Sequence, residues 1–384
     1  MKESSVILLA LAGLVGFVAG SAANPAKKPA GKAVAAPKKP VSTKKKLVSQ
    51  RKPRYKPAPP VDPTEGDNVD GDDPAVRRAA VQALGTMNGA VVGVDPVNGR
   101  VLTIVNQKLA LKSGFIPCST IKLVTGLAAL SDHVIERTTL IRLGRYSSYN
   151  LTAAIAKSNN PFFQRLGNQL GFERVTYYAR MLGLGEKAGL DIPGEEPGSW
   201  PEKSPGPGGV GMMTAYGENI QMTPLELAAL LSAIANGGTL YYLQYPQTQE
   251  AAEHFTPQVK RSLDLAPNGI GDIKIGMRAA VDFGTARRAG YDANEPILGK
   301  TGTCTDFRTA NSHMGWFGSF NEVDHHQIVL VVMLLGTKTV NGPVASGVAG
   351  AIYRTLSEQR YFIADAKKRS DLPEILVTSP CCSR

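Results

Sequence analysis

The part of the sequence that can fold lacks an excess of either charge. Residues 61–384 carry 30 basic and 31 acidic residues, although the whole chain has a formal net charge of +11. The basic excess lies in residues 24–60, which hold twelve Lys or Arg residues, eight prolines and no Asp or Glu. A folded nucleic-acid-binding face needs a basic stripe, and residues 61–384 have no positive charge to spare for one. The charge balance therefore argues against a nucleic-acid partner.

Residues that bind metals are also scarce. The five histidines show no spacing typical of a metal site, and we read them as surface or structural residues. They are His133, His254, His313, His325 and His326. We therefore expect no metal and no other cofactor. Of the four cysteines, Cys381 and Cys382 lie in a polar tail after Pro380 and stay unassigned.

The N-terminus has an apolar segment that nearly reaches the length needed to span a membrane. Lys2 precedes an apolar run from Val6 to Gly20, which is followed by the small residues 21–23. This pattern is typical of a cleaved secretory signal, and its length also allows an uncleaved membrane anchor. Residues 1–23 are predicted to be one or the other. Either places the remainder outside the cytoplasm, in the periplasm or at the outer face of the cytoplasmic membrane.

Residues 24–73 are predicted to be a disordered linker. The first part is rich in Lys, Pro and Ala, and an acidic stretch follows from Asp62 to Asp73. Such a composition cannot bury a core and behaves as an extended tether. Its positive charge also favours association with anionic envelope polymers or lipid headgroups.

One folded domain is expected over residues 74–362, before a polar C-terminal tail at 363–384. Asp73-Pro74 is typical of a helix start, and DPVNG between two β-rich runs is typical of a hairpin. The pattern is then mostly helical from Ser119 to about Gly238. β-rich runs return from about Gly299, and a helix-like segment closes the domain. We therefore expect an α+β fold whose antiparallel sheet comes from both ends of the domain, with flanking helices and an inserted helical lobe.

The first chemical candidate is Ser119 with Lys122, in FIPCSTIKLVTGLAAL. If Ser119 opens a helix, the two side chains lie one turn apart on one face. A buried lysine loses its proton readily and can then take the proton of a serine nucleophile. Two other Ser-x-x-Lys patterns, at Ser42 and Ser49, lie in the Lys-rich linker and are read as chance.

Two further elements are weak when each is taken alone. Ser158-Asn159-Asn160 precedes Pro161 and, taken alone, is better explained as a helix cap. Lys300-Thr301-Gly302-Thr303 opens a β-rich run and could line a cleft, with Gly302 leaving room for a ligand backbone. The alternative is an ordinary edge-strand lysine and a turn glycine.

Together and in this order, Ser-x-x-Lys, Ser-x-Asn and Lys-Thr-Gly are the signature of penicillin-recognising serine enzymes. Over roughly residues 75–360 the sequence resembles the transpeptidase domain of penicillin-binding proteins, which are related to serine β-lactamases. DPVNGRVLTIV, GLDIPGEEPG, YGENIQMTPLELAALLSAIANGG, FGTARRAG, LGKTGTC and MGWFGSF carry the resemblance beyond the three motifs. Cys118 departs from the pattern, because the family often has glycine before the nucleophile.

The resemblance implies a serine D,D-transpeptidase or D,D-carboxypeptidase that acts on D-Ala-D-Ala peptidoglycan stem peptides and binds β-lactams covalently. Ser119 would be the nucleophile and Lys122 the base. Ser158 would relay a proton to the leaving amine, and Asn160 would hold Lys122 and the substrate amide. Lys300 would supply positive charge. The Thr301-Gly302-Thr303 segment would bind the substrate, with both threonine hydroxyls on its carboxylate.

The resemblance also implies a disulfide between Cys118 and Cys304. Some class A β-lactamases resemble this arrangement, with a disulfide that joins the two equivalent positions across the cleft. An exported location permits such a bond. The alternative is a pair of buried free thiols.

Two other functions remain open at this level. A β-lactamase needs an efficient deacylation base. Glu195 or Glu196 could be proposed for this role, but the sequence has no Glu-x-x-x-Asn element between Asn160 and Thr223. A non-catalytic β-lactam sensor is usually tied to a multi-helix membrane domain, whereas we expect at most one N-terminal span here. A non-catalytic cell-wall scaffold would not need all three motifs intact. The sequence does not identify the acceptor of the acyl group.

Overall fold

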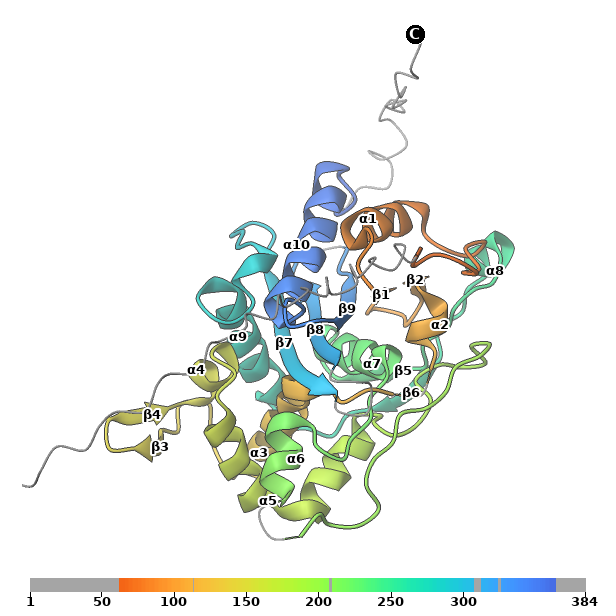
Figure 1. Ribbon diagram of the computed structural model, residues 1–384. Coiled ribbons are helices and arrows are strands. Elements are labelled where there is room, and N and C mark those ends of the chain that lie inside the picture. Colours follow the sequence, from red (N-terminus) through yellow and green to blue (C-terminus); the bar gives the residue numbers. More distant parts are fainter. Residues whose placement is uncertain (1–61, 113, 207–208, 307–311, 324–325, 364–384) are drawn as a thin grey trace, which may run out of the picture. The chain divides into compact units, whose positions relative to one another are not determined.

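The structure is a computed structural model that describes residues 62–112, 114–206, 209–306, 312–323 and 326–363 (Figure 1). The predicted signal or anchor, the basic part of the linker and most of the C-terminal tail, with Cys381 and Cys382, lie outside these ranges. Within them, every helix is too short or too polar to cross a membrane.

Helices outnumber strands in the described ranges, and most of the helices lie between the N-terminal and C-terminal strands. The helices are α1 (Pro74–Leu84), α2 (Gln107–Ala110), η1 (Cys118–Ile121), α3 (Lys122–Ser131), α4 (Leu151–Ala156), α5 (Asn160–Met181), α6 (Gly209–Tyr216), α7 (Pro224–Ala235), α8 (Gln249–Glu253), α9 (Gly269–Asp282), η2 (Arg287–Ala289) and α10 (Gly342–Glu358). The strands are β1 (Gly89–Val94), β2 (Val101–Val105), β3 (Ile141–Gly144), β4 (Ser147–Tyr149), β5 (Thr239–Tyr241), β6 (Val259–Ser262), β7 (Ile297–Asp306), β8 (Ser312–Asn321) and β9 (Val329–Gly336).

The main sheet of the described residues is antiparallel and has the order β2-β1-β9-β8-β7. Its first two strands form the predicted hairpin, and its last three come from the C-terminal part of the domain. The expectation of one sheet made from both ends of the domain is therefore confirmed. Strand β7, which carries Lys300, lies at one edge and pairs only with β8.

The two faces of this sheet bury two separate apolar cores. Successive side chains of a strand point to opposite faces, and β9 alternates strictly between the two cores. Val329, Val331 and Met333 pack into one core, whereas Leu330, Val332 and Leu334 pack into the other. The run IVLVVMLL is apolar throughout because both faces of the strand are covered.

Different helices cover the two faces. Helices α1 and α10 lie together on one face, and α3, α5 and α6 belong to the lobe on the other (Figure 1). Helix α1 begins where Asp73 accepts hydrogen bonds from the amides of Ala75 and Val76, as expected of an N-cap. Helix α7 is buried along its whole length, which explains its nearly continuous apolar sequence.

The acidic stretch before α1 departs from the linker prediction. The Asp67 carboxylate pairs with Arg77 at 2.7 Å and accepts hydrogen bonds from the amides of Asn106 and Gln107 at 2.9 and 2.8 Å. Its side chain is 1% exposed. Residues 62–73 therefore contact the domain instead of extending into water, because the Asp67 and Asp72 carboxylates find partners there.

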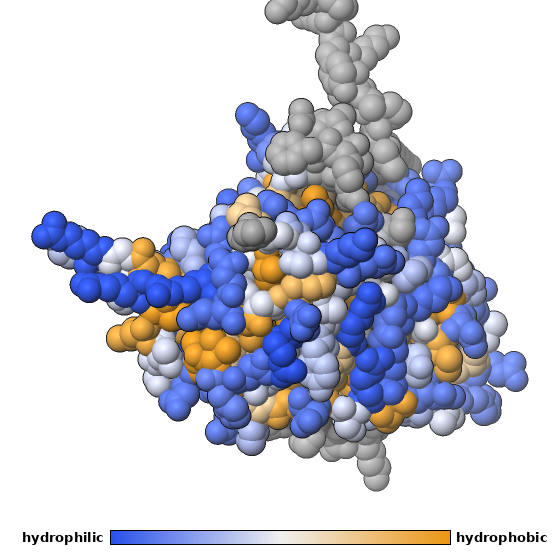
Figure 2. Space-filling view, turned by 90° about the horizontal axis from the view of Figure 1, so that it is seen from below, coloured by the Kyte–Doolittle hydropathy of each residue, from blue (hydrophilic) through white to orange (hydrophobic). Residues whose placement is uncertain are grey.

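The β3–β4 hairpin projects from the helical lobe, at the left in Figures 1 and 2. Figure 2 shows hydrophilic residues along the projection and a hydrophobic area beside it. Leu140 and Tyr146 are 69% and 90% exposed. The rest of this face mixes hydrophilic and hydrophobic residues, as folded domains commonly do.

Candidate active site

The candidate nucleophile lies in a 3₁₀ turn in front of a buried helix. Ser119 belongs to η1, and Lys122 is the first residue of α3. In a 3₁₀ turn residues three apart are eclipsed, so the two side chains lie on one face. Lys122 Nζ is 2.9 Å from Ser119 Oγ. Ser119 is partly exposed, so a ligand can reach it, whereas Lys122 is fully buried.

The Lys122 amine is surrounded by the second motif. Its Nζ lies 2.8 Å from the Ser158 carbonyl oxygen and 3.1 Å from Ser158 Oγ, and it also contacts Asn160 Oδ1. Burial, and secondarily the charge of Lys300, lowers the pKa of Lys122 to about 6. At neutral pH the amine is therefore mostly unprotonated and can accept the proton of Ser119.

The Ser158-Asn159-Asn160 motif both caps a helix and lines the site. Asn159 caps α5, since its side chain accepts a hydrogen bond from the Phe162 amide at 2.9 Å. Ser158 has a φ of 53°, in the left-handed region that non-glycine residues rarely adopt. This turn lets Ser158 and Asn160 face Lys122 while Asn159 faces the helix. The capping interpretation thus applies to Asn159 alone.

Lys300 approaches the same serine from the edge of the sheet. Its Nζ is 2.8 Å from Ser158 Oγ and 2.9 Å from the Thr301 carbonyl oxygen. Complete burial lowers the pKa of Lys300 to about 7. The hydroxyl of Ser158 therefore lies between two amines that both exchange protons near neutral pH, which suits it to proton transfer.

The remaining residues of the Lys-Thr-Gly motif point alternately to the two faces of β7. A Cβ added at Gly302 would lie 3.1 Å from the Pro117 carbonyl oxygen and 3.3 Å from the Cys118 Cβ. Gly302 thus allows β7 to approach the nucleophile turn closely, whereas the sequence had suggested room for a ligand backbone. Thr301 and Thr303 lie on the opposite face, beside the start of α10.

The two cysteines join the nucleophile turn to β7. Cys118 and Cys304 are paired in a disulfide, 186 residues apart in sequence. Cys118 has a φ of 51°, a left-handed conformation that glycine adopts without cost. A glycine would adopt this conformation without strain, and a bonded Cys118 is held there by β7.

Glu195, one of the two suggested deacylation bases, is engaged elsewhere. Its side chain accepts hydrogen bonds from the Ala188 amide at 2.8 Å and the Gly189 amide at 3.1 Å, and the residue is 4% exposed. These contacts hold its own loop together. Among the described residues, no group of three or more His, Cys, Asp or Glu side chains is placed to hold a metal ion.

Two contacts of the site had no counterpart in the sequence motifs. The ring of Phe163 lies 5.6 Å from Lys122 Nζ, and the Thr285 hydroxyl lies 2.6 Å from the Thr301 hydroxyl. Thr285 belongs to FGTARRAG, which resembles a family block, but no spacing rule assigns it a role. Phe163 reads in sequence as an ordinary core residue of α5.

Comparison with known sequences agrees with this geometry. The sequence profile of the penicillin binding protein transpeptidase domain matches residues 89–358. The chain belongs to this family. The match covers the five strands of the main sheet, the three motifs and both paired cysteines, so the resemblance drawn from the motifs is confirmed at the level of the family.

Curated relatives of this transpeptidase domain are longer proteins. Stage V sporulation protein D of Bacillus subtilis is 27% identical over 311 residues, covering 71% of this chain and 48% of the relative. The peptidoglycan D,D-transpeptidase MrdA of Acinetobacter baumannii is 24% identical over 303 residues, covering 63% of this chain and 45% of the relative. The chain thus spans about half the length of these two relatives.

Solved structures confirm the fold. The transpeptidase domain of penicillin-binding protein 3 from Burkholderia pseudomallei superposes with a TM-score of 0.66 at 20% identity, over 76% of this chain and 95% of that one. The D,D-transpeptidase domain of a peptidoglycan glycosyltransferase from Eggerthella lenta gives a TM-score of 0.61 at 20% identity, over 75% and 82% of the two chains. The predicted β-lactamase/transpeptidase-like α+β fold is therefore confirmed.

Proposed function

We propose that this chain is a serine D,D-acyltransferase that cleaves the terminal D-Ala-D-Ala bond of peptidoglycan stem peptides and is acylated by β-lactams. The observation that carries the proposal is the buried Lys122 amine 2.9 Å from Ser119 Oγ, with a pKa lowered to about 6. The family membership and the names of the relatives, which include peptidoglycan D,D-transpeptidases, support the same reaction class.

In the proposed acylation Lys122 takes the proton of Ser119 as Oγ attacks the substrate carbonyl carbon. Two backbone amides, those of Ser119 and Thr303, would stabilise the oxyanion, each by about 3 kcal/mol. The C–N bond then breaks, and Ser158 passes a proton to the leaving D-alanine amine. Ser158 is replenished by Lys122 or Lys300, whose amines lie 3.1 and 2.8 Å from its hydroxyl.

The substrate would be held at both ends of the scissile bond. Asn160 would bind the amide of the donor peptide, and the hydroxyls of Thr301 and Thr303 would bind its terminal carboxylate. The acyl group on Ser119 then passes to water, which gives a carboxypeptidase, or to the amine of a second stem peptide, which gives a transpeptidase.

We place this reaction outside the cytoplasm. Some of the relatives are named peptidoglycan D,D-transpeptidases, and the N-terminal residues 1–23 have the pattern of a signal or anchor. Export would also let the Cys118–Cys304 disulfide persist, since such bonds survive in oxidising compartments. Residues 24–61 would then act as a basic tether that holds the domain near anionic envelope polymers or headgroups.

Labelling with a fluorescent penicillin tests the acyl-enzyme. The wild-type protein should retain the label covalently through denaturing electrophoresis, and Ser119→Ala should lose it. Ser147→Ala, which changes an exposed serine of the β3–β4 hairpin, is the matched control and should label like wild type. An unlabelled wild type, or a labelled Ser119→Ala, would refute the proposal.

Product analysis then identifies the acceptor. Incubation with purified muropeptides should release D-alanine alone if water is the acceptor, and cross-linked dimers if a second stem peptide is. Fast turnover of a chromogenic cephalosporin would instead indicate a β-lactamase, which the engagement of Glu195 with its own loop argues against.

A further inference from the structure

The carboxylate-binding side of β7 has a third hydroxyl that the motifs do not include. Thr285 lies between α9 and η2, and its Oγ1 is 2.6 Å from the Oγ1 of Thr301. Among the described residues, Thr301 is the hydrogen-bond partner of the Thr285 hydroxyl. Two hydroxyls joined by one hydrogen bond use one of their two protons, so one proton remains for a ligand. If Thr285 donates, the proton that remains is that of Thr301.

Thr303 is oriented in a similar way by the backbone. Its Oγ1 accepts a hydrogen bond of 2.8 Å from the Gly342 amide, at the first residue of α10. Because the oxygen accepts from this amide, its proton is free to point elsewhere. The start of α10 also carries partial positive charge, which favours an anion beside it. Thr301 and Thr303 are two residues apart on one face of β7, so both spare protons lie on the same side of the strand.

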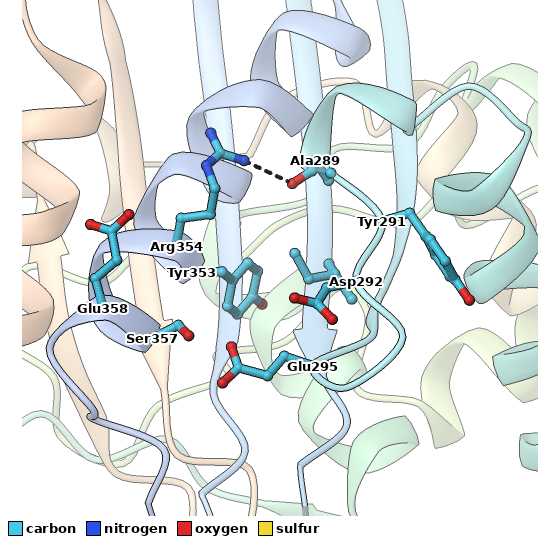
Figure 3. Close-up of a pocket in the computed structure, with 10 residues that line it drawn as sticks. Ala289, Tyr291, Asp292, Glu295, Tyr353, Arg354, Ser357 and Glu358 are labelled. Carbon is cyan, nitrogen blue, oxygen red and sulfur yellow. Dashed lines mark hydrogen bonds between the residues drawn. The ribbon is translucent and has the colours of Figure 1, made fainter.

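The segment that carries Thr285 is fixed at both ends. On one side the Thr285 amide donates to the Ala156 carbonyl oxygen at 3.0 Å, and a Cβ at Gly284 would lie 2.2 Å from that same oxygen. On the other side, η2 is held by α10, where the Arg354 guanidinium donates to the Ala289 carbonyl oxygen at 3.3 Å (Figure 3). The Thr285 hydroxyl is therefore positioned by backbone contacts and need not be ordered by the ligand.

We propose that Thr285 is a positioning residue for recognition of the substrate's terminal carboxylate. It donates to Thr301 and thereby aims the Thr301 proton at one carboxylate oxygen, while the Gly342 amide leaves the Thr303 proton for the other. The inference rests on the proposed function and deepens it, because it makes the site selective for a donor that ends in a free carboxylate. Replacing that carboxylate by an uncharged ester removes the negative charge and leaves weaker acceptors, so the two hydroxyls should contribute less to binding.

The test compares a penicillin with its methyl ester on full-length variants. Thr285→Val keeps the shape of the side chain and removes the hydroxyl, whereas Thr285→Ser keeps the hydroxyl. Thr285→Val should lower the second-order acylation rate constant for the free acid by about three- to tenfold, and the constant for the ester by less than twofold. The loss should appear in the dissociation constant of the non-covalent complex and not in the limiting acylation rate. Thr285→Ser should restore the acid-to-ester ratio of wild type.

The ratio of the two probes is measured on one protein preparation, so a fraction of unfolded protein cancels. Thr337→Val is the matched control, because it breaks another hydroxyl pair, with Thr339 at 3.1 Å, and should leave the ratio unchanged. Equal losses for acid and ester in Thr285→Val would show a merely structural role and overturn the inference while the proposed function stands. A wild type that neither probe acylates would refute the proposed function itself.

Discussion

Removing the charge of Lys300 should move the pH dependence of acylation toward alkaline pH. Lys122 must be unprotonated to act as the base, so the acylation rate should rise with pH through the pKa of Lys122, at about 6. Burial is the first cause of that low pKa and the charge of Lys300 the second. The pKa of Lys300 itself is lowered to about 7, so Lys300 is mostly charged where Lys122 titrates. In Lys300→Met this repulsion is absent, and the pKa of Lys122 should rise.

The size of the shift follows from the geometry. Both amines contact Ser158 Oγ, at 3.1 and 2.8 Å, so they lie within about 6 Å of each other. Two like charges at that distance repel by about 3 kcal/mol at an effective dielectric constant of ~20. This energy corresponds to roughly 2 pKa units. Because burial remains in the variant, we expect the acid-side midpoint to rise by about 1 to 2 pH units and to stay well below the usual pKa of lysine.

The assay is the second-order rate constant for labelling by a fluorescent penicillin between pH 5 and 9. Lys300→Met will label more slowly at every pH, because Lys300 also serves substrate binding in the proposed mechanism, so the midpoint is read against the variant's own plateau. Lys157→Met is the control. It removes an exposed charge next to Ser158, which solvent screens, and should leave the midpoint in place. A midpoint in Lys300→Met that is unchanged or more acidic would refute the reasoning.

Two further predictions concern stability. Asp67→Asn breaks the buried ion pair with Arg77 and should lower the free energy of unfolding, measured in urea, by about 3 kcal/mol. A loss below about 1 kcal/mol would mean that residues 62–73 add little to the stability of the domain. The disulfide is tested in a variant that lacks the two C-terminal cysteines, Cys381→Ser with Cys382→Ser. Once denatured, this variant should show free thiols only after reduction. Replacing Cys118 and Cys304 by Ser in addition should lower its free energy of unfolding by about 2 to 4 kcal/mol. Thiols that titrate before reduction would contradict the disulfide.

The sheet and the lysine cluster were predictable from sequence because each leaves a local pattern. Alternating and continuous apolar runs mark the strands, and DPVNG marks the turn between β1 and β2. The three motifs were recognisable by their order, although none was decisive alone. Their convergence on Ser158, which is contacted by Lys122 and Lys300, depends on long-range packing that no single motif contains.

Three features could not be read from sequence, each for a physical reason. The acidic stretch looked like a solvated linker because composition does not reveal the buried partners of Asp67. The Thr285 contact joins residues 16 apart across two elements, and an isolated threonine carries no signature. Gly302 was assigned to ligand access, whereas its neighbour is the protein's own nucleophile turn. In each case the missing information is a tertiary contact.

The site also combines several features that are unfavourable to folding. Lys122 and Lys300 are both buried, close to each other. Two residues near Lys122, Cys118 and Ser158, adopt left-handed backbone conformations, which cost non-glycine residues of order 1 kcal/mol or more. Each is held by a specific contact: Cys118 by its bond to β7, and Ser158 by the cap that Asn159 places on α5. Loosening either contact should let the lysines regain water, which raises their pKa values. Lys122 would then be mostly protonated at neutral pH and could no longer accept the proton of Ser119. Stability and catalytic competence therefore depend on the same few contacts around Ser119.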